Sequence, residues 1–151
     1  MRERIIALVG NPNCGKTTLF NALTGAHQKV GNWPGVTVEK KTGLISSAAL
    51  QGQLIDLPGI YSLEQSHLGR DEQIALAFLR AEPCDLVINI VDSASLDRSL
   101  ILTQQLIETG IPVVLALNML DVANSQGIAI DAAALSRRLG VPVVPMVASR
   151  R

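Results

Sequence analysis

Short runs of consecutive hydrophobic residues recur along the chain, each with the length of a β-strand. The runs cover residues 5–9, 54–57, 86–91, 113–117 and 141–147. Continuous rather than alternating hydrophobicity is typical of strands that are buried on both faces of a parallel sheet. The pattern therefore predicts a mainly parallel sheet at the centre of the fold.

Stretches with helical periodicity lie between these runs. They cover residues 16–24, 71–80, 96–109 and 131–139. Gly25, Gly110 and Gly140 follow three of the helix ends, as C-cap glycines do, and Asp131 is a suitable N-cap for the last helix. Strands that alternate with helices in this way predict an α/β fold.

The segment 40–57 differs, because it contains two strand candidates joined by a short turn near Gln51 and Gly52. Such a turn predicts a hairpin, and hence one antiparallel pair at the edge of the sheet. The sheet is then expected to have six strands, with helices on both faces. Two stretches, 26–39 and 59–69, match neither period, and loops of that length in a compact domain are usually functional.

Composition narrows the possible classes of protein. The chain has 151 residues, of which 48% are hydrophobic and 17% charged, and its formal net charge is zero. These values predict one folded domain and exclude disorder, and they give no basis for binding nucleic acid or an acidic membrane surface. No apolar run approaches the roughly 18 residues of a membrane helix and no signal peptide is recognisable, so a cytoplasmic location is expected. The two cysteines support neither a disulfide framework nor a zinc site.

Residues 10–17, with the sequence GNPNCGKT, match the pattern G-x-x-x-x-G-K-[ST] between the first predicted strand and the first predicted helix. Glycines let successive backbone N–H groups point inward, and the helix N-terminus adds its positive dipole end. Lys16 is expected to reach the β- and γ-phosphates, and the Thr17 hydroxyl to bind magnesium. The residues expected to contact the nucleotide here are Gly10, Asn11, Pro12, Asn13, Cys14, Gly15, Lys16, Thr17 and Thr18.

The sequence DLPG at residues 56–59 follows the next parallel strand candidate. Asp56 is expected to hold magnesium through water, and the Gly59 N–H to meet the γ-phosphate. Alone this pattern is often an ordinary turn. After a phosphate-binding loop it becomes informative.

The sequence NMLD at residues 118–121 ends a further strand, at the sheet edge where open α/β folds bind ligands. A carboxylate at Asp121 can accept two hydrogen bonds from the N1–H and 2-amino groups of guanine. Adenine presents an acceptor at N1 and lacks the 2-amino donor, so Asp121 disfavours it. Asn118, Met119 and Asp121 therefore predict a preference for GTP over ATP.

The three motifs, in this order, resemble those of the Ras-like small GTPase fold. The resemblance implies that Thr37 is the switch I threonine, whose hydroxyl completes a magnesium shell only when a γ-phosphate is present. It also implies that Gly35 and Val36 lie beside the nucleotide and that the backbone N–H of Ala148, followed by Ser149, lies near the guanine oxygen. A Ras-like fold normally continues with a C-terminal helix, which is missing here, so apolar sheet surface is expected to be exposed.

One family resemblance is closer. The stretch GNWPGVTVE at residues 31–39 is similar to the cytosolic G domain of the FeoB ferrous iron transporter, as are GNPN, DLPG with YSL, DEQ and NMLD. The match runs nearly end to end. It implies a GTPase module that gates or energises iron(II) uptake by a membrane domain in the bacterial inner membrane, with a helical regulatory domain between the two. Neither of those further domains is part of this sequence.

The position that holds a water-orienting glutamine in Ras-like enzymes is Ile60 here, and residues 26–39 contain no arginine. Intrinsic turnover is therefore expected to be slow. The family resemblance implies a potassium ion in place of the arginine, held by the Asn13 side chain and the backbone carbonyls of Gly31 and Trp33. Lys16, Thr37, Gly59 and Asn13 are then the residues expected to act in hydrolysis.

Several alternatives remain open at this point. The chain could be a nucleotide-responsive binding module that scarcely hydrolyses GTP, or an ATP-dependent kinase that uses the same loop. Trp33 could serve local packing rather than a switch or cation shell. Cys14, at a helix N-terminus, is interpreted as a small residue that fills the loop rather than a reactive thiol. His27 and His67 make a poor iron(II) site, because no carboxylates cluster with them.

Overall fold

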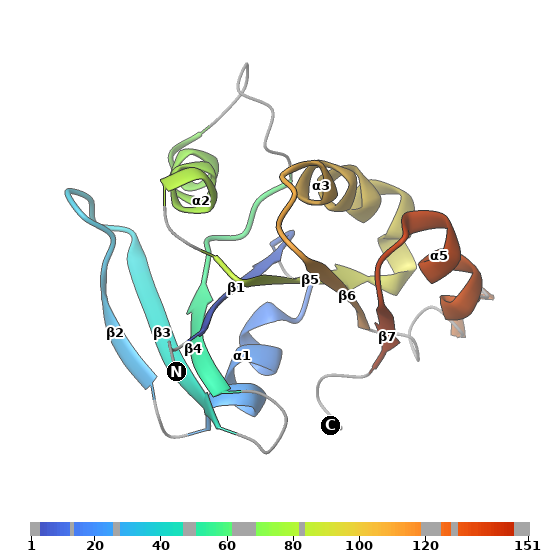
Figure 1. Cartoon of the computed structure of the whole chain (residues 1–151), viewed down its shortest axis with the longest axis horizontal. Coiled ribbons are helices and arrows are strands. Elements are labelled where there is room, and N and C mark those ends of the chain that lie inside the picture. The colour runs from blue at the N-terminus through green and yellow to red at the C-terminus, as the bar shows by residue number, and fades with distance from the viewer. Residues whose placement is uncertain are drawn as a thin grey trace.

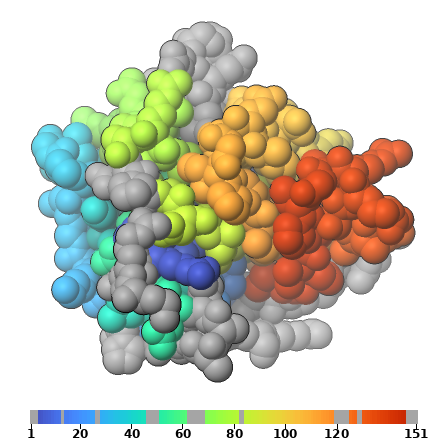
Figure 2. All heavy atoms as spheres, viewed as in Figure 1, coloured from blue at the N-terminus to red at the C-terminus, as the bar shows by residue number. Residues whose placement is uncertain are grey.

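A computed structural model describes residues 4–12, 14–25, 28–46, 51–61, 69–81, 84–118, 125–127 and 130–146. Within these residues the core is a seven-stranded sheet in the order β2-β3-β4-β1-β5-β6-β7, shown in Figure 1. The strands are β1 (Arg4–Gly10), β2 (Gln28–Asn32), β3 (Glu39–Ser46), β4 (Gln51–Asp56), β5 (Leu86–Asp92), β6 (Val113–Asn118) and β7 (Val143–Pro145). Figure 2 shows β2 at one end of the molecule and the helix α5 (Ala132–Leu139) at the other.

Helices cover both faces of the sheet, as the sequence predicts. They are α1 (Lys16–Thr24), α2 (Arg70–Ala81), α3 (Leu96–Glu108) and α5 (Ala132–Leu139), with a 3-10 turn at Ser93–Ser95. Buried residues of α2 and α3 pack on one side of the sheet, and Leu19 and Phe20 of α1 pack on the other. Asp131 caps α5 by accepting a 3.1 Å hydrogen bond from the Ala134 N–H, and Gly140 ends the helix with a φ of 74°. The α/β class and these helix ends are confirmed.

The sheet is mostly parallel. The pairs β1–β4, β1–β5, β5–β6 and β6–β7 are parallel, whereas β2–β3 and β3–β4 are antiparallel. Only β3 therefore runs against the other described strands. The predicted hairpin of residues 40–57 is present as β3 and β4.

The sequence prediction is wrong about the position of the turn in this hairpin and about the number of strands in the sheet. Gln51 and Gly52 are not a turn, because they already belong to β4 and pair with Ser46 and Ile45. A Cβ at Gly52 would lie 2.6 Å from the backbone oxygen of Arg4, so the glycine allows β4 to approach β1 closely. The seventh strand, β2, comes from a predicted loop. Its last four residues are exposed, so no hydrophobic pattern marks it, and pairing with β3 defines it.

One sheet face is only partly covered. In β7, Val144 pairs with Ala116 of β6, and Ala116 belongs to the cluster on the α1 side. Val144 is 49% exposed. Among the described helices, none combines the length and apolar character needed to cross a bilayer.

Candidate functional site

The carboxyl ends of four parallel strands bring the predicted motifs together. In the sheet register, Leu8 of β1 pairs with Asp56, Gly10 pairs with Ile90 of β5, and Asp92 of β5 pairs with Asn118 of β6. Because parallel strands end at one edge, the loop after Gly10, Asp56 and Asn118 share that edge of the sheet, and Figure 1 shows β4, β1, β5 and β6 side by side. This is the position at which open α/β sheets bind ligands.

The loop after β1 requires its two glycines. A Cβ at Gly10 would lie 2.7 Å from both the Ile90 backbone oxygen and the Cys14 Sγ. Gly15 has a φ of +93°, and a Cβ there would lie 2.0 Å from the Asn118 Nδ2. The chain then enters α1, whose first turn contains no acidic residue. The positive end of the α1 dipole is therefore not offset within its own first turn.

Lys16 and Asp56 form an ion pair across this loop. The Lys16 Nζ donates to the Asp56 Oδ1, and the two side chains are 13% and 11% exposed. The pair places a cation at the start of α1 beside a carboxylate at the end of β4. Thr17 and Thr18 follow Lys16 on the exposed first turn of α1, so the Thr17 hydroxyl and the Asp56 carboxylate supply oxygen donors at one end of the sheet.

Asn118 and Cys14 join the guanine motif to the phosphate loop. The Asn118 Nδ2 donates a 2.9 Å hydrogen bond to the Cys14 backbone oxygen. The Cys14 side chain is buried, and this burial raises the pKa of its thiol to about 11. A thiol that stays protonated is a poor nucleophile, so the structure supports the interpretation of Cys14 as a packing residue.

The segment after Asp56 lies directly on the phosphate loop. A Cβ at Gly59 would lie 3.1 Å from atoms of Pro12, and the Ile60 N–H donates a 3.0 Å hydrogen bond to the Gly10 oxygen. The Ile60 side chain is fully buried in the cluster that contains Leu57. Position 60 therefore presents its backbone, not its side chain, to the loop.

The residues of the first long loop lie in β2 and in the turn that follows it. Gly31 belongs to β2, which is three strands from β1, a lateral distance of about 14 Å at the usual strand spacing. Trp33 is buried, whereas Gly35 and Thr37 are exposed in the turn between β2 and β3, and Val36 is half-buried. In the sheet register Lys41 of β3 pairs with Asp56, so the β2–β3 turn lies beyond the same edge of the sheet as that carboxylate. Asn13, Met119, Asp121, Ala148, Ser149, His27 and His67 lie outside the described residues.

A polar network behind the loop is absent from the sequence predictions. The Thr103 Oγ1 of α3 donates to the Asn89 Oδ1, and the Asn89 Nδ2 donates to the Val9 oxygen at 3.2 Å. One turn earlier in α3, the Ser99 Oγ accepts a 3.4 Å hydrogen bond from the Asn11 Nδ2. The network ties α3 to β1 and to the start of the phosphate loop. An asparagine inside the hydrophobic run 86–91 was the available signal.

Comparisons with known proteins agree with this geometry. A solved structure of the cytosolic domain of L. pneumophila FeoB is 51% identical, with a TM-score of 0.92, and the match covers 97% of this chain and 64% of that chain. A GDP-bound mutant of S. thermophilus NFeoB is 50% identical, with a TM-score of 0.90, over 98% of this chain and 57% of that chain.

Curated sequences give the same result. The Fe(2+) transporter FeoB of Salmonella typhimurium and that of Escherichia coli (strain K12) are each 55% identical over 99% of this chain. This chain spans 20% of the length of those relatives. The family model described as Ferrous iron transport protein B matches residues 4–151. By its Ras-like fold, its motifs and these matches, the chain belongs to the ferrous iron transport protein B family.

Proposed function

We propose that this domain binds guanine nucleotides and hydrolyses GTP to GDP and phosphate. The observation that carries the proposal is that Lys16 pairs with Asp56 and Asn118 binds the Cys14 oxygen, both at the loop of residues 10–17. This loop has room only for glycine at positions 10 and 15. The S. thermophilus relative solved with GDP bound supports it. In the longer parent protein, the nucleotide state of this domain would regulate or drive ferrous iron uptake.

Each charged group has a task in this proposal. Lys16 moves from Asp56 to the β- and γ-phosphates, whose charge an ammonium offsets. The N–H groups of residues 10–17 and the Gly59 N–H orient the phosphate oxygens. The release of Lys16 leaves the Asp56 carboxylate free, with the Thr17 hydroxyl on the neighbouring turn.

The donors at this edge fit magnesium. Asp56 and Thr17 are hard oxygen ligands, and Mg²⁺ is usually bound by one or two carboxylates together with substrate phosphates. Thr37 would join them once the turn between β2 and β3 moves toward the phosphates. When bound, Mg²⁺ supplies neutralisation of charge on the phosphate oxygens.

The choice of guanine depends on residues 118–121. The bond from Asn118 to the Cys14 oxygen fixes the start of this segment against the phosphate loop. Asp121 would accept two hydrogen bonds from the guanine edge, with Met119 beside the base and the backbone of Ala148 and Ser149 near its oxygen. An ATP-dependent kinase would leave Asp121 without a task.

Hydrolysis here must proceed without a glutamine at position 60. Because the Ile60 side chain is buried, it does not orient the attacking water; backbone groups of the switch loops are the proposed substitute, and we expect slow intrinsic turnover. A potassium ion held by Asn13 and by the Gly31 and Trp33 carbonyls would supply the positive charge that other GTPases take from arginine. Gly31 lies in the edge strand β2 and Trp33 in the turn after it, so we propose that the β2–β3 turn closes over the phosphates when this site forms.

Single-turnover GTP hydrolysis in potassium and in sodium chloride, at equal ionic strength and saturating magnesium, tests this function. We expect faster hydrolysis in potassium and loss of the difference in Asn13→Ala. Equal rates in both salts would contradict the potassium site. Tight GTP binding with negligible turnover in either salt would instead favour a nucleotide-responsive switch module, which the burial of Ile60 makes the second candidate. Competition by ATP against labelled GDP would favour the kinase.

The parent protein sets the expected partners. The relatives are transporters of which this chain spans one fifth, so we propose that the domain sits on the cytoplasmic side of the bacterial inner membrane. There it would act on a helical regulatory domain and a transmembrane iron-transport domain.

A further inference from the structure

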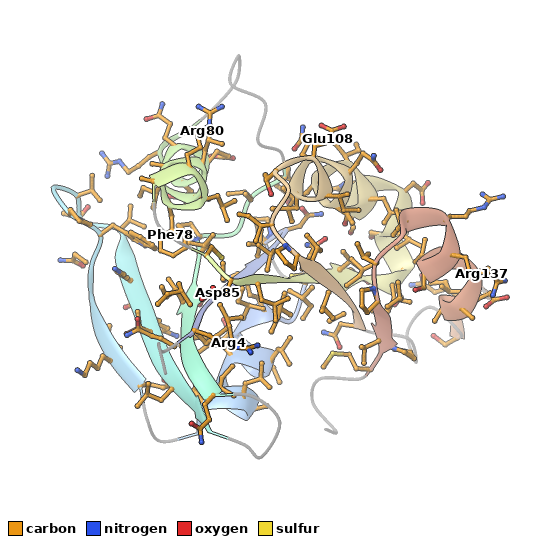
Figure 3. All side chains as sticks on the ribbon, viewed as in Figure 1. Arg4, Phe78, Arg80, Asp85, Glu108 and Arg137 are labelled. Carbon is orange, nitrogen blue, oxygen red and sulfur yellow. The ribbon has the colours of Figure 1, made fainter. Side chains whose placement is uncertain are left out.

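Trp33 is docked on helix α2. Its neighbours Asn32, Pro34 and Gly35 are exposed, yet its own side chain is 7% exposed. The ring meets Phe78 edge to face, with centroids 5.9 Å apart and an interplanar angle of 77°. Figure 3 shows Phe78 pointing from α2 toward the sheet, whereas Arg80 of the same helix points away from it. An edge-to-face aromatic pair adds attraction beyond the burial of its area.

A cation covers the same ring. The Lys40 Nζ of β3 lies 4.7 Å from the centroid of the Trp33 ring. A lysine over an indole face at this distance is attracted by the ring quadrupole. Phe78 and Lys40 thus form a seat for Trp33 that joins one helix to one strand.

The seat determines where Thr37 lies. The Trp33 N–H donates to the Val38 oxygen at 2.9 Å, and the Val36 N–H donates to the Trp33 oxygen at 3.2 Å. Val36 and Val38 pack against the same buried cluster as Trp33. These contacts fold residues 33–38 into one unit, in which Thr37 is exposed. A displacement of Trp33 would therefore break two backbone hydrogen bonds that hold the turn around Thr37.

One unsatisfied polar group opposes the burial of Trp33 on α2. The indole N–H of Trp33 is buried and has no hydrogen-bond acceptor among the described residues. A buried donor without a partner opposes the conformation that buries it. Leu57 and Ile60, which flank the Gly59 N–H, belong to the same cluster as Trp33 and Phe78. A shift of that segment toward a phosphate would therefore change the packing of the cluster in which Trp33 is buried.

We propose that Phe78 is a positioning residue: with Lys40 it holds Trp33, and through Trp33 it holds residues 33–38, with Thr37 exposed, in their present arrangement until GTP binds. This inference rests on the proposed nucleotide function. It assigns α2 the task of setting the balance between the GDP and GTP states, a coupling in which each nucleotide shifts the position of the switch by its differential affinity.

Trp33 is the only tryptophan of the 151 residues, so its emission reports the docked state. The test compares the wild type with Phe78→Ala, without nucleotide, with GDP and with a non-hydrolysable GTP analogue. We expect blue-shifted, poorly quenched emission for the wild type without nucleotide and with GDP, and a red shift with the analogue. Phe78→Ala should show the red shift without nucleotide.

The affinities provide the second readout. Because docking disfavours the GTP state, Phe78→Ala should raise the preference for the analogue over GDP by about fivefold or more, the lower end of ordinary coupling between sites. Phe78→Leu keeps most of the apolar volume, so its preference for the analogue over GDP should lie between that of the wild type and that of Phe78→Ala. Leu79→Ala is the matched control, since Leu79 is a buried α2 residue of the same cluster but not an aromatic partner of Trp33. It should lose stability and keep the blue emission.

The outcomes separate the two proposals. Unchanged emission in a folded Phe78→Ala protein, or a red shift equal to that of Leu79→Ala, overturns the seat. A red shift with an unchanged ratio of affinities overturns the positioning of Thr37 while leaving nucleotide binding intact. Failure of the wild type to bind either nucleotide overturns the proposed function and the positioning role with it.

Discussion

The side-chain amide of Asn118 holds the backbone of Cys14, with 2.9 Å between the Asn118 Nδ2 and the Cys14 oxygen. Asn118 ends β6, whereas Cys14 belongs to the loop after β1, so one hydrogen bond joins the segments proposed to bind the base and the phosphates. Asn118 is 3% exposed and Cys14 is 1% exposed. In a buried setting, loss of the donor leaves the carbonyl unpaired.

Asn118→Ala should therefore weaken both the fold and the site. We expect a loss of about 1–3 kcal/mol in the free energy of unfolding, the cost of an unsatisfied buried group. GDP affinity should fall at least about tenfold. Chemical denaturation and GDP titration measure the two effects. Asn32→Ala, at an exposed position of β2, should change neither, and equal losses in both variants would contradict the role of Asn118.

Gly15→Ala separates backbone strain from a direct clash. The positive φ at residue 15 costs a non-glycine residue about 1–2 kcal/mol, and the added Cβ would lie 2.0 Å from the Asn118 Nδ2. Asn118 must then shift, so GDP binding should be lost.

Gly110→Ala is the matched control for Gly15→Ala. Gly110 has a φ of +83°, with no atom within 4 Å of an added Cβ. It should lose similar stability but keep GDP affinity. Retention of GDP binding in Gly15→Ala would show that the loop tolerates the clash.

Ile60→Gln restores the residue type found in Ras-like enzymes at this position, yet we expect no acceleration of GTP hydrolysis. The Ile60 side chain is fully buried against apolar residues, so the amide would lie in the core and not beside a water. The free energy of unfolding should fall by about 1–3 kcal/mol. In the control Ile101→Gln, the residue is 57% exposed on α3, so the free energy of unfolding should change little. A faster single-turnover rate in Ile60→Gln would show that this side chain reaches the site.

The Cys14 thiol should be unreactive in the folded protein. Its pKa is raised from 9.0 to about 11, so at pH 8 the thiolate fraction is about a hundredfold lower than that of an ordinary thiol. Labelling by a thiol reagent in a Cys84→Ala background should be slower than in denaturant by at least this factor. Rapid labelling of the folded protein would contradict the burial of Cys14.

The same raised pKa fixes a pH dependence of stability. Between pH 9.0 and about 11 the unfolded chain loses the thiol proton while the folded chain keeps it. The contribution of the protonated Cys14 thiol to the free energy of unfolding is therefore fully present below pH 9.0. It is lost as the pH rises through about 11. Denaturation curves of the wild type and Cys14→Ala should show a steeper fall with pH for the wild type in this window.

Much of the fold was predictable from the sequence because burial leaves a pattern. The central strands are covered on both faces, and their hydrophobic runs located them to within a few residues. β2 left no such pattern, since Val30 is 62% exposed and the strand is defined by pairing with β3. Gly52 suggested a turn, although its actual task is to let β4 approach Arg4.

The site shows the same division. The placement of the motif of residues 10–17 beside Asp56 was predictable because both follow neighbouring parallel strands, whereas the phosphate and metal binding proposed for them stays a prediction. The seat of Trp33 was not, since Phe78 lies 45 positions away (78 minus 33) on another element. Contacts of that kind depend on tertiary packing, which no local pattern encodes. The bond from Asn118 to Cys14, which spans 104 positions, belongs to the same class.

The ion pair between Lys16 and Asp56 bears on which ligands the proposed site rejects. A lone anion such as inorganic phosphate or sulfate would have to take Lys16 from Asp56 and leave a carboxylate, 11% exposed, beside it. That exchange gains little, because one attraction is replaced by another while a repulsion is added. A ligand that arrives with a divalent cation satisfies both partners at once. We therefore expect the pair to lower the affinity of the site for free phosphate relative to a nucleotide that brings its own magnesium ion, and to favour release of the product phosphate.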